Sequence, residues 1–305
     1  MKSHLRYLLY FLLPILFLGG TLECLLRTVP SSYETKRQQI DSCANDIGIL
    51  FLGPSHIYMG VRPSLMKVPA YNLAQVSQSG EYDLKLLKDL REKQKLRNLH
   101  TVVLNIDAGI LFDVPLRQGG EAFRLIYYRR YMDLDRESWI SLNDFEVSSF
   151  TNVKMKIASL GESKDSPDCD AFGWYKGYDI SKKEAVLTSA EFAEATVKKH
   201  IAGGLDAARA NMKVYRELVA YCKAQNWDIV ILRTPCTADY MRFIPAGYEK
   251  CCTDLLYSLQ KDYGVRIGDY SRDTRFAESD FYDCDHLTNE GARRFTEILC
   301  QDFGW

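Results

Sequence analysis

Short apolar runs and amphipathic stretches alternate along most of the chain. Runs of about four to eight apolar residues that stop at turn residues are typical of strands buried on both faces of a parallel sheet. Apolar residues at helical spacing follow them at 82–94, 205–225 and 248–263. This alternation predicts a doubly wound α/β sheet. The strands are expected at 47–52, 68–74, 101–106, 229–232 and 265–267.

The N-terminal apolar run differs from these strands in length and flanks. It covers residues 7–22, follows Lys2 and Arg6, and ends at Glu23. Its length lies between that of a signal-peptide core and the ~20 residues that span a bilayer. Positive charge before the run favours an uncleaved anchor with its N-terminus in the cytoplasm, and a cleaved signal peptide is the alternative. Residues 1–26 are therefore interpreted as a membrane anchor or signal segment.

The rest of the chain is expected to be a polar connector followed by one large domain. Residues 27–45 are polar and are interpreted as a juxtamembrane connector, and 46–305 as the α/β domain. Within it, 112–204 has weak periodicity and is expected to be an insertion after the third strand. Its aromatic rings could stack on sugars, although packing is the commoner role of such rings. They include Tyr127, Tyr128, Trp139, Trp174 and Tyr175.

Charge and cysteine content limit the classes of partner. Lysine and arginine number 39 against 40 aspartate and glutamate residues, so the net charge of -1 gives no basis for a nucleic-acid partner. The nine cysteines form no C-x-x-C pair and no regular zinc spacing. Their number is odd, and disulfides remain open for a domain outside the cytosol.

Gly53-Pro54-Ser55-His56 ends the first predicted strand. In open parallel sheets, ligands bind in the crevice outside the carboxyl ends of the strands. A serine at that point is therefore a candidate nucleophile. The alternative is that Ser55 caps the helix that follows, since serine is a favoured helix cap.

A serine nucleophile needs a base within hydrogen-bond reach, and the chain has five histidines. His4 lies before the apolar run, His100 enters the third strand from its amino end, and His200 falls in a helical stretch of the insertion. His56 directly follows the candidate nucleophile, where neighbouring side chains seldom align for proton transfer. This elimination leaves His286 as the candidate base.

His286 belongs to a loop whose acidic residues suit the same chemistry. Asp283 lies three residues earlier and can turn back to hold the ring, whereas Asp285 is expected to point elsewhere. Thr288 is a plausible cap for the last helix, which leaves His286 in the loop before it. Two alternatives stay open, a divalent metal bound by these carboxylates and the imidazole, or a solvated loop that only caps the helix. No second His/Asp cluster completes a metal site, so neither a metal nor a cofactor is expected.

Together the two stretches resemble the SGNH (GDSL-like) hydrolase superfamily. Its first motif places the nucleophile directly after the first strand, as Ser55 is placed here, and its last motif is Asp-x-x-His, as in Asp283-Cys284-Asp285-His286. The N-terminal run, the Ser-His pair and Asn72-Leu73-Ala74 resemble membrane-anchored bacterial members linked to cell-surface polysaccharides. These include relatives of the alginate O-acetylation proteins and of the D-alanyl transfer protein of teichoic-acid modification. The resemblance covers about 46–106 and 226–303 and implies a three-layer, flavodoxin-like doubly wound parallel sheet.

The resemblance also implies an activity. It implies an extracytoplasmic serine esterase or O-acyltransferase, acting on acetyl groups of an acylated cell-envelope glycan. Ser55 would attack the acyl group, His286 would act as base and then acid, and Asp283 would orient His286. The implied location is the bacterial inner membrane, with a single span, a periplasmic domain and a membrane-bound acyl-transfer partner. The alternative is a non-catalytic glycan-binding or assembly subunit on the same scaffold.

The oxyanion hole is where the chain departs from this superfamily. The second motif supplies a glycine and the third a Gly-x-Asn, but the corresponding turns here are residues 76–80 and 105–109. Losing a side-chain donor to the oxyanion costs on the order of a hundredfold or more in rate. The candidates for oxyanion or substrate contacts are Ser77, Gln78, Asn105, Asp107 and His56.

Overall fold

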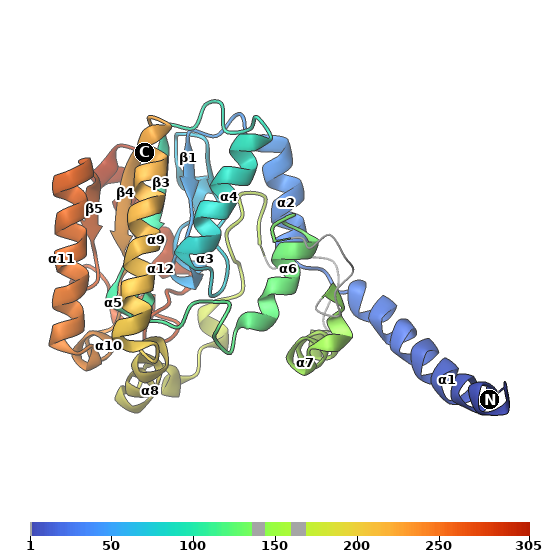
Figure 1. Cartoon of the computed structure of the whole chain (residues 1–305). Helices are drawn as coiled ribbons and strands as arrows, with labels where there is room; N and C mark the ends of the chain where they lie inside the picture. Colours follow the sequence, from blue (N-terminus) through green and yellow to red (C-terminus); the bar gives the residue numbers. More distant parts are fainter. Residues whose placement is uncertain (1, 136–143, 160–168) are drawn as a thin grey trace. The chain divides into compact units, whose positions relative to one another are not determined.

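The computed structural model describes residues 2–135, 144–159 and 169–305, which fall into two compact units (Figure 1). The first unit covers Met1–Thr35 and Ala122–Pro167, and the second covers Lys36–Glu121 and Asp168–Trp305. The expected insertion at 112–204 is thus divided, because its middle part, Ala122–Pro167, groups with the N-terminal helix and the rest with the sheet.

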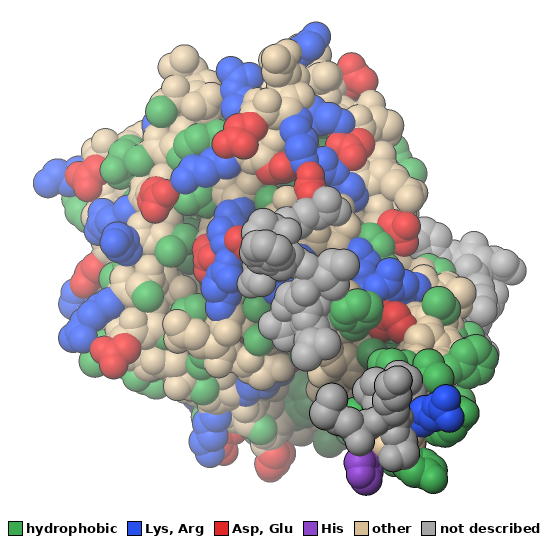
Figure 2. Space-filling model, turned by 45° about the vertical axis from the view of Figure 1, so that its right-hand side comes forward, with side chains coloured by type: hydrophobic (Ala, Val, Ile, Leu, Met, Phe, Trp, Pro, Cys, Tyr) green, Lys and Arg blue, Asp and Glu red, His purple; other side chains and the backbone are tan. Residues whose placement is uncertain are grey.

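The first unit contains the N-terminal helix α1 (Lys2–Arg27). Its stretch Arg6–Arg27 has a mean hydropathy of 2.0 over 22 residues, which is apolar and long enough for a membrane span or a signal sequence. The helix continues five residues past the end of the predicted apolar run. Hydrophobic side chains gather along it, as Figure 2 shows, and most of them are exposed. The shorter elements of this unit are η2 (Ala122–Arg124), α6 (Leu125–Arg130), η4 (Glu146–Ser148) and α7 (Phe150–Ser159).

Buried ion pairs hold the last turns of α1 in this unit. The fully buried Glu146 carboxylate pairs with Arg130 at 2.5 Å and with Lys156 at 2.8 Å. On α1, the buried Glu23 carboxylate accepts the backbone N–H of Val147 at 3.1 Å. Since removing one partner of a buried pair leaves an uncompensated charge, these contacts tie the end of α1 to the segment after residue 122.

The second unit is built on a five-stranded parallel sheet with the order β2-β1-β3-β4-β5. This order reverses between β1 and β3, as it does in a flavodoxin-like doubly wound sheet. The predicted fold class is therefore confirmed, and each predicted strand is present. The strands are β1 (Ile49–Phe51), β2 (Ala70–Asn72), β3 (Thr101–Asn105), β4 (Asp228–Arg233) and β5 (Arg266–Asp269).

Helices cover both faces of this sheet. On one face, α4 (Gly80–Glu92), α9 (Gly204–Ala224) and α11 (Ala246–Tyr263) pack side by side, close to their predicted bounds (Figure 1). On the other face, α3 (Ser55–Gly60) packs on α12 (Asn289–Phe303), and both contribute to one core with the strands. The remaining elements are η1 (Pro63–Leu65), α5 (Ala108–Leu111), η5 (Ile180–Lys182), η6 (Ala185–Thr188), α8 (Ala190–His200), α10 (Ala238–Phe243) and η7 (Glu278–Asp280).

The polar stretch expected to be a connector contains a helix, α2 (Ser32–Cys43). Its Ile40 side chain is buried, and so is Lys36, whose ammonium donates to the carbonyl of Ala74 and lies 3.6 Å from the ring centroid of Tyr58. Because a lysine occupies one of the buried positions of α2, the sequence shows no clear apolar face for this helix. All nine cysteines are free thiols.

Candidate active site

Ser55 is the first residue of α3, directly after the end of β1. The turn requires glycine, since Gly53 has φ +125° and a Cβ there would lie 3.2 Å from the Cβ of Asn105. Pro54 occupies the N-cap position of α3, with no side-chain cap. The alternative in which Ser55 caps the helix is therefore wrong, because Ser55 lies one residue inside it and its hydroxyl bonds elsewhere.

Asn72, the last residue of β2, fixes the direction of α3. Its buried amide donates to the backbone carbonyl of Ile57 at 2.8 Å and to that of Val61 at 2.9 Å. Its side-chain oxygen accepts the N–H of Ala74 at 3.2 Å. The sequence resemblance included Asn72 but gave it no role. The sequence signal for this role was the position of Asn72, a polar residue at the end of an apolar run, since a buried amide needs hydrogen-bond partners.

The loop between η7 and α12 is closed at its base. Phe281 and Leu287 form an antiparallel bridge, and the N–H of Thr288 donates to the carbonyl of Asp280 at 2.8 Å. The Thr288 hydroxyl accepts the N–H of Gly291 at 3.0 Å and caps α12, as predicted. These bonds hold residues 282–286 as a tight loop over the carboxyl edge of the sheet.

Three side chains from the two ends of the second unit form a continuous hydrogen-bond chain. The Oγ of Ser55 lies 2.8 Å from Nε2 of His286, and both carboxylate oxygens of Asp283 lie 3.0 Å from Nδ1 of the same ring. Asp283 is itself held, because its Oδ1 accepts the backbone N–H groups of Asp285 at 3.0 Å and His286 at 2.7 Å. This is the geometry that a nucleophile, a general base and an orienting carboxylate require.

The charge around His286 favours its protonated form. Burial works against an imidazolium here, but the carboxylates of Asp283 and Asp285 outweigh it and raise the pKa of His286 well above its ordinary value. Asp285 Oδ1 lies 3.4 Å from Nδ1 of the ring. The site is thus suited to hold a proton taken from Ser55.

Asp285 contacts two histidines, His286 through Oδ1 and His56 through Oδ2, which corrects the expectation that its side chain points elsewhere. Its Oδ2 lies 2.9 Å from Nε2 of His56, and Nδ1 of His56 lies 3.5 Å from a carboxylate oxygen of Asp107. His200, at the end of α8, has Nδ1 3.7 Å from Asp285 and 2.9 Å from the hydroxyl of Tyr240. Sequence reasoning missed this cluster, since contacts between such distant segments leave no local pattern. Of the side chains considered above as metal ligands, Asp283 hydrogen-bonds to His286 and Asp285 hydrogen-bonds to His56.

Two of the candidate oxyanion donors are turned into the protein. The buried Asn105 amide donates to the carbonyl of Leu232 at 2.8 Å and to Asp107 at 3.3 Å. The buried Gln78 amide donates to Asp83 at 2.7 Å. Neither amide is left to bind an oxyanion, which corrects the expectation for Asn105 and Gln78. Ser77 is partly exposed and has φ +57°.

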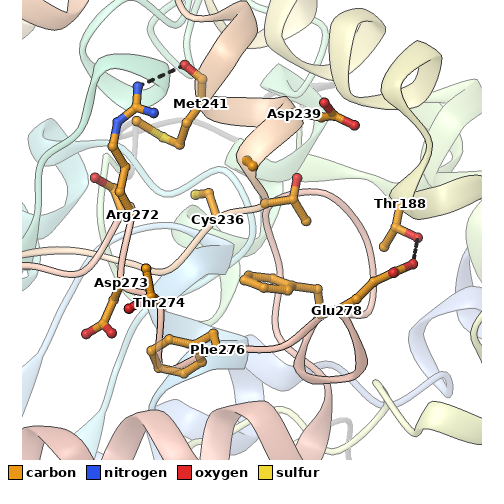
Figure 3. A pocket seen from close by; sticks show the side chains of 13 residues that line it. Thr188, Cys236, Asp239, Met241, Arg272, Asp273, Thr274, Phe276 and Glu278 are labelled. Carbon is orange, nitrogen blue, oxygen red and sulfur yellow. Dashed lines mark hydrogen bonds between the residues drawn. The ribbon is translucent and has the colours of Figure 1, made fainter.

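Two cavities border this region. A small one of about 40 Å³ is lined by Pro54, by the 77–80 turn and by residues of α9 and the segment after α5. A larger one of about 580 Å³ lies beyond the ends of β4 and β5, where Arg272 donates to the Met241 carbonyl and Glu278 faces Thr188 (Figure 3). The side chains of Ser55, His286 and Asp283 line neither of these two cavities.

The aromatic ring beside the candidate base is Tyr178, which the sequence did not single out. Its centroid lies 5.8 Å from that of His286, and it stacks on Tyr282 at 4.0 Å. Of the rings named from the sequence, Tyr175 packs edge-on against Tyr178 at 5.3 Å and also contacts Tyr58. Tyr127, Tyr128 and Trp174 are buried in packing, and Trp139 lies outside the described residues.

Asp83 on α4 supports the turn before Ser55. Its Oδ1 accepts the backbone N–H of Gly53 at 3.1 Å as well as the Gln78 amide, while its Oδ2 is buried with no hydrogen-bond partner among the described residues. Burial, only partly offset by these two bonds, raises the pKa of Asp83 from 3.8 to about 7.

We expect Asp83→Asn to change the pH dependence of stability. Between pH 4 and 7 the folded chain keeps a proton on Asp83 that the unfolded chain has released, so the free energy of unfolding falls as pH rises through this range. Asparagine does not titrate, so the variant should gain on the order of 2 kcal/mol relative to the parent between pH 4.5 and 7.5. Thermal melts measure this, with the exposed Asp254→Asn as control. A difference that stays constant over this pH range would contradict the assignment.

No protein-family model matches the chain, and no curated protein matches it. Solved structures do match. The lipase/acylhydrolase from Enterococcus faecalis is 11% identical, over 84% of this chain and 95% of that chain, with a TM-score of 0.37. A GDSL-like lipase from Bacteroides thetaiotaomicron is 10% identical, over 89% and 97%, with a TM-score of 0.40. The chemistry proposed below rests on this chain's own side chains. The strand order β2-β1-β3-β4-β5 and the hydrogen-bonded Ser55, His286 and Asp283 agree with what the resemblance of the motifs to the SGNH (GDSL-like) hydrolases led us to expect.

Proposed function

We propose that this chain is a serine-dependent esterase or O-acyltransferase that acts on an acylated glycan of the cell envelope. The observation that carries the proposal is the unbroken path from Ser55 Oγ through His286 to Asp283, with contacts of 2.8 and 3.0 Å. A serine without such a base is a weak nucleophile at its own pKa.

The geometry supports two successive acyl transfers. As Ser55 Oγ attacks the ester carbonyl, Nε2 of His286 takes the hydroxyl proton, and Asp283 stabilises the imidazolium at Nδ1. His286 then gives the proton to the departing alcohol oxygen, which leaves an acyl-serine. In the second transfer, His286 takes a proton from the acceptor, the acceptor oxygen attacks the acyl carbonyl, and Ser55 recovers its proton. Water as acceptor makes an esterase, and a glycan hydroxyl makes a transferase.

Backbone N–H groups supply the oxyanion hole in this proposal. The N–H of Ser55 has no acceptor among the described residues, so it is available to the oxyanion. The second donor comes from the turn of residues 77–80, which lines the small cavity together with Pro54. With Asn105 and Gln78 turned inward, the hole lacks their side-chain donors, and we expect modest rates.

Three features support the choice of substrate. The small cavity is lined by Pro54, the residue before Ser55, and we assign a short acyl group such as acetyl to it. Tyr178 and Tyr282 beside the candidate base offer aromatic surface, on which sugar rings pack well. The N-terminal helix suits a chain held at the inner membrane with its catalytic unit in the periplasm, where a membrane-bound acyl-transfer partner would supply the acyl group.

The test is active-site labelling of the full chain in detergent. A fluorophosphonate should modify the parent at Ser55, as peptide mapping reads out, and should leave Ser55→Ala unlabelled. Ser42→Ala, a change at an exposed serine of α2, should label like the parent. Equal labelling of the parent and Ser55→Ala would overturn the proposal. Incubation with an acetylated glycan, with and without an acceptor glycan, separates release of acetate from its transfer.

A second candidate is a non-catalytic glycan-binding or assembly subunit on the same scaffold. It is favoured by the inward turn of the Asn105 amide, which removes the side-chain donor of the third superfamily motif. It predicts glycan binding of equal strength for the parent and Ser55→Ala, with no labelling of either.

A further inference from the structure

We propose that His56 is a positioning residue whose imidazolium neutralises Asp285 and so sets the pH range in which His286 acts as a base. The inference rests on the proposed function, since it takes His286 to be the base. The observation behind the inference is the position of Asp285, whose carboxylate contacts two imidazoles. Oδ2 lies 2.9 Å from Nε2 of His56, and Oδ1 lies 3.4 Å from Nδ1 of His286.

The surroundings of His56 favour the imidazolium. The side chain is buried. Its Nε2 hydrogen-bonds to Asp285 at 2.9 Å, and its Nδ1 lies 3.5 Å from a carboxylate oxygen of Asp107, at ion-pair distance and without a hydrogen-bond partner among the described residues. A neutral imidazole has one N–H donor, whereas an imidazolium has two. Burial alone would lower the pKa of His56, but Asp107 and Asp285 outweigh it and raise the pKa to about 9.

A second carboxylate beside His286 would be harmful without this cation. Asp283 already stabilises the imidazolium of His286 at 3.0 Å, and an unpaired Asp285 would add to the effect. With His56 in place these carboxylates already raise the pKa of His286 well above its ordinary value, and without that cation the pKa would rise further. The pH range in which Nε2 is unprotonated and can accept the proton of Ser55 would then begin at higher pH. The His56 ring centroid lies 5.0 Å from that of His286, so its charge opposes protonation of His286 directly as well.

The other groups that face this pair do not replace the charge of His56. Burial lowers the pKa of His200, which contacts Asp285 at 3.7 Å and the Tyr240 hydroxyl at 2.9 Å. Cys284 Sγ lies 3.4 Å from Asp285, and burial raises the pKa of this thiol, as it raises that of the Tyr178 hydroxyl. At pH 7 all of these groups are therefore neutral.

One further cation acts on this cluster from β4. The pKa of Asp107 lies below its ordinary value. Burial alone would raise this pKa, but the contact with His56 outweighs burial, and Arg233 adds a smaller lowering effect. Its guanidinium is paired with Asp269 at 2.8 Å and with Glu249 at 2.6 Å. Among the described side chains, His56 is thus the one placed between Asp107 and Asp285 with a nitrogen toward each.

Charge-removing variants give opposite expected shifts. His56→Asn should move the acidic limb of the pH profile of kcat/KM up by about one unit or more, which lowers the rate at pH 6 about tenfold. Asp285→Asn should move the same limb down, because His286 loses one of its two carboxylates. The double variant removes one charge of each sign and should return toward the parent profile. If the role of His56 were purely structural, the two single variants would not shift the acidic limb in opposite directions, and the double variant would not return toward the parent profile.

A second readout does not depend on activity. The full chain in detergent, with 13C-labelled histidine and Ser55→Ala, gives signals from five histidines, and a His286→Gln variant assigns the one that matters. The titration midpoint of His286 should rise in His56→Asn and fall in Asp285→Asn, while His100→Asn, a change at the opposite edge of the sheet, should leave it unchanged. An unmoved midpoint, or shifts of the same sign, overturns the inference. Should His56→Asn fail to fold, Asp285→Asn and the double variant decide. Midpoints that move as expected in a chain without esterase activity would reject the proposed function alone.

Discussion

His286→Ala is expected to lose on the order of 10⁴- to 10⁶-fold in kcat on an acetylated sugar, the largest effect among single substitutions. In the parent, Nε2 of His286 lies 2.8 Å from Ser55 Oγ. Alanine removes both the acceptor for the serine proton and the donor that protonates the leaving alcohol, so both transfers lose their acid–base group. Initial rates of acetate release at saturating substrate measure the loss.

His100→Ala is the matched control. His100 lies at the amino end of β3, where its ring bonds to the hydroxyl of Thr101 at 2.9 Å. We expect a change of less than about twofold, because surface changes away from a site usually have small effects. A His286→Ala variant that kept a tenth of the parent rate would rule out His286 as the base.

Asp283→Asn is expected to lower kcat by about 10⁴-fold with little change in fold. Asp283 Oδ1 accepts two backbone N–H groups, at 3.0 and 2.7 Å, and the oxygen of asparagine can keep both bonds. The new NH₂ group must then replace Oδ2, which lies 3.0 Å from Nδ1 of His286. The retained oxygen, also 3.0 Å from Nδ1, already accepts two backbone N–H groups, so the NH₂ donor shifts the balance toward Nδ1 as an acceptor and toward the ring proton at Nε2. The ring is then in the wrong tautomer to accept the proton of Ser55.

Acetate release under the same conditions, compared with Asp254→Asn, tests this expectation. The comparison with Asp285→Asn identifies the orienting carboxylate. If Asp283→Asn lost less than tenfold while Asp285→Asn lost thousands, Asp285 would hold the ring. In that case the 3.4 Å contact of Asp285 would be the productive one.

The strands of the sheet could be predicted because parallel strands are buried on both faces, which makes each a dense apolar run between turns. Helix α2 could not be predicted, since its buried stripe contains Lys36. Its amino group donates to the Ala74 carbonyl and lies over the Tyr58 ring, and burial lowers its pKa to about 7. The sequence does not distinguish a buried lysine from an exposed one, because the difference lies in tertiary contacts.

The candidate site divides in the same way. Ser55, Asp283 and His286 could be identified from the sequence by elimination. Each lies at the boundary of a strand or helix, and parallel folds bring such boundaries to one edge of the sheet. The inward turn of Asn105 depends on the carbonyl of Leu232 in the neighbouring strand, and the approach of His200 depends on how α8 packs. Such side-chain directions are fixed by partners that lie from 40 to 127 residues away in the chain, and local patterns do not carry them.

The hydrogen bond between Ser55 and His286 joins residues 231 positions apart. Contacts over such separations form late in folding, because the entropy of closing the intervening chain must be overcome first. A chain with its sheet in place but α12 undocked would expose a serine hydroxyl with no base beside it. Nucleophilic reactivity in this protein is therefore withheld until folding is complete, and in refolding it should appear after the helical signal has recovered.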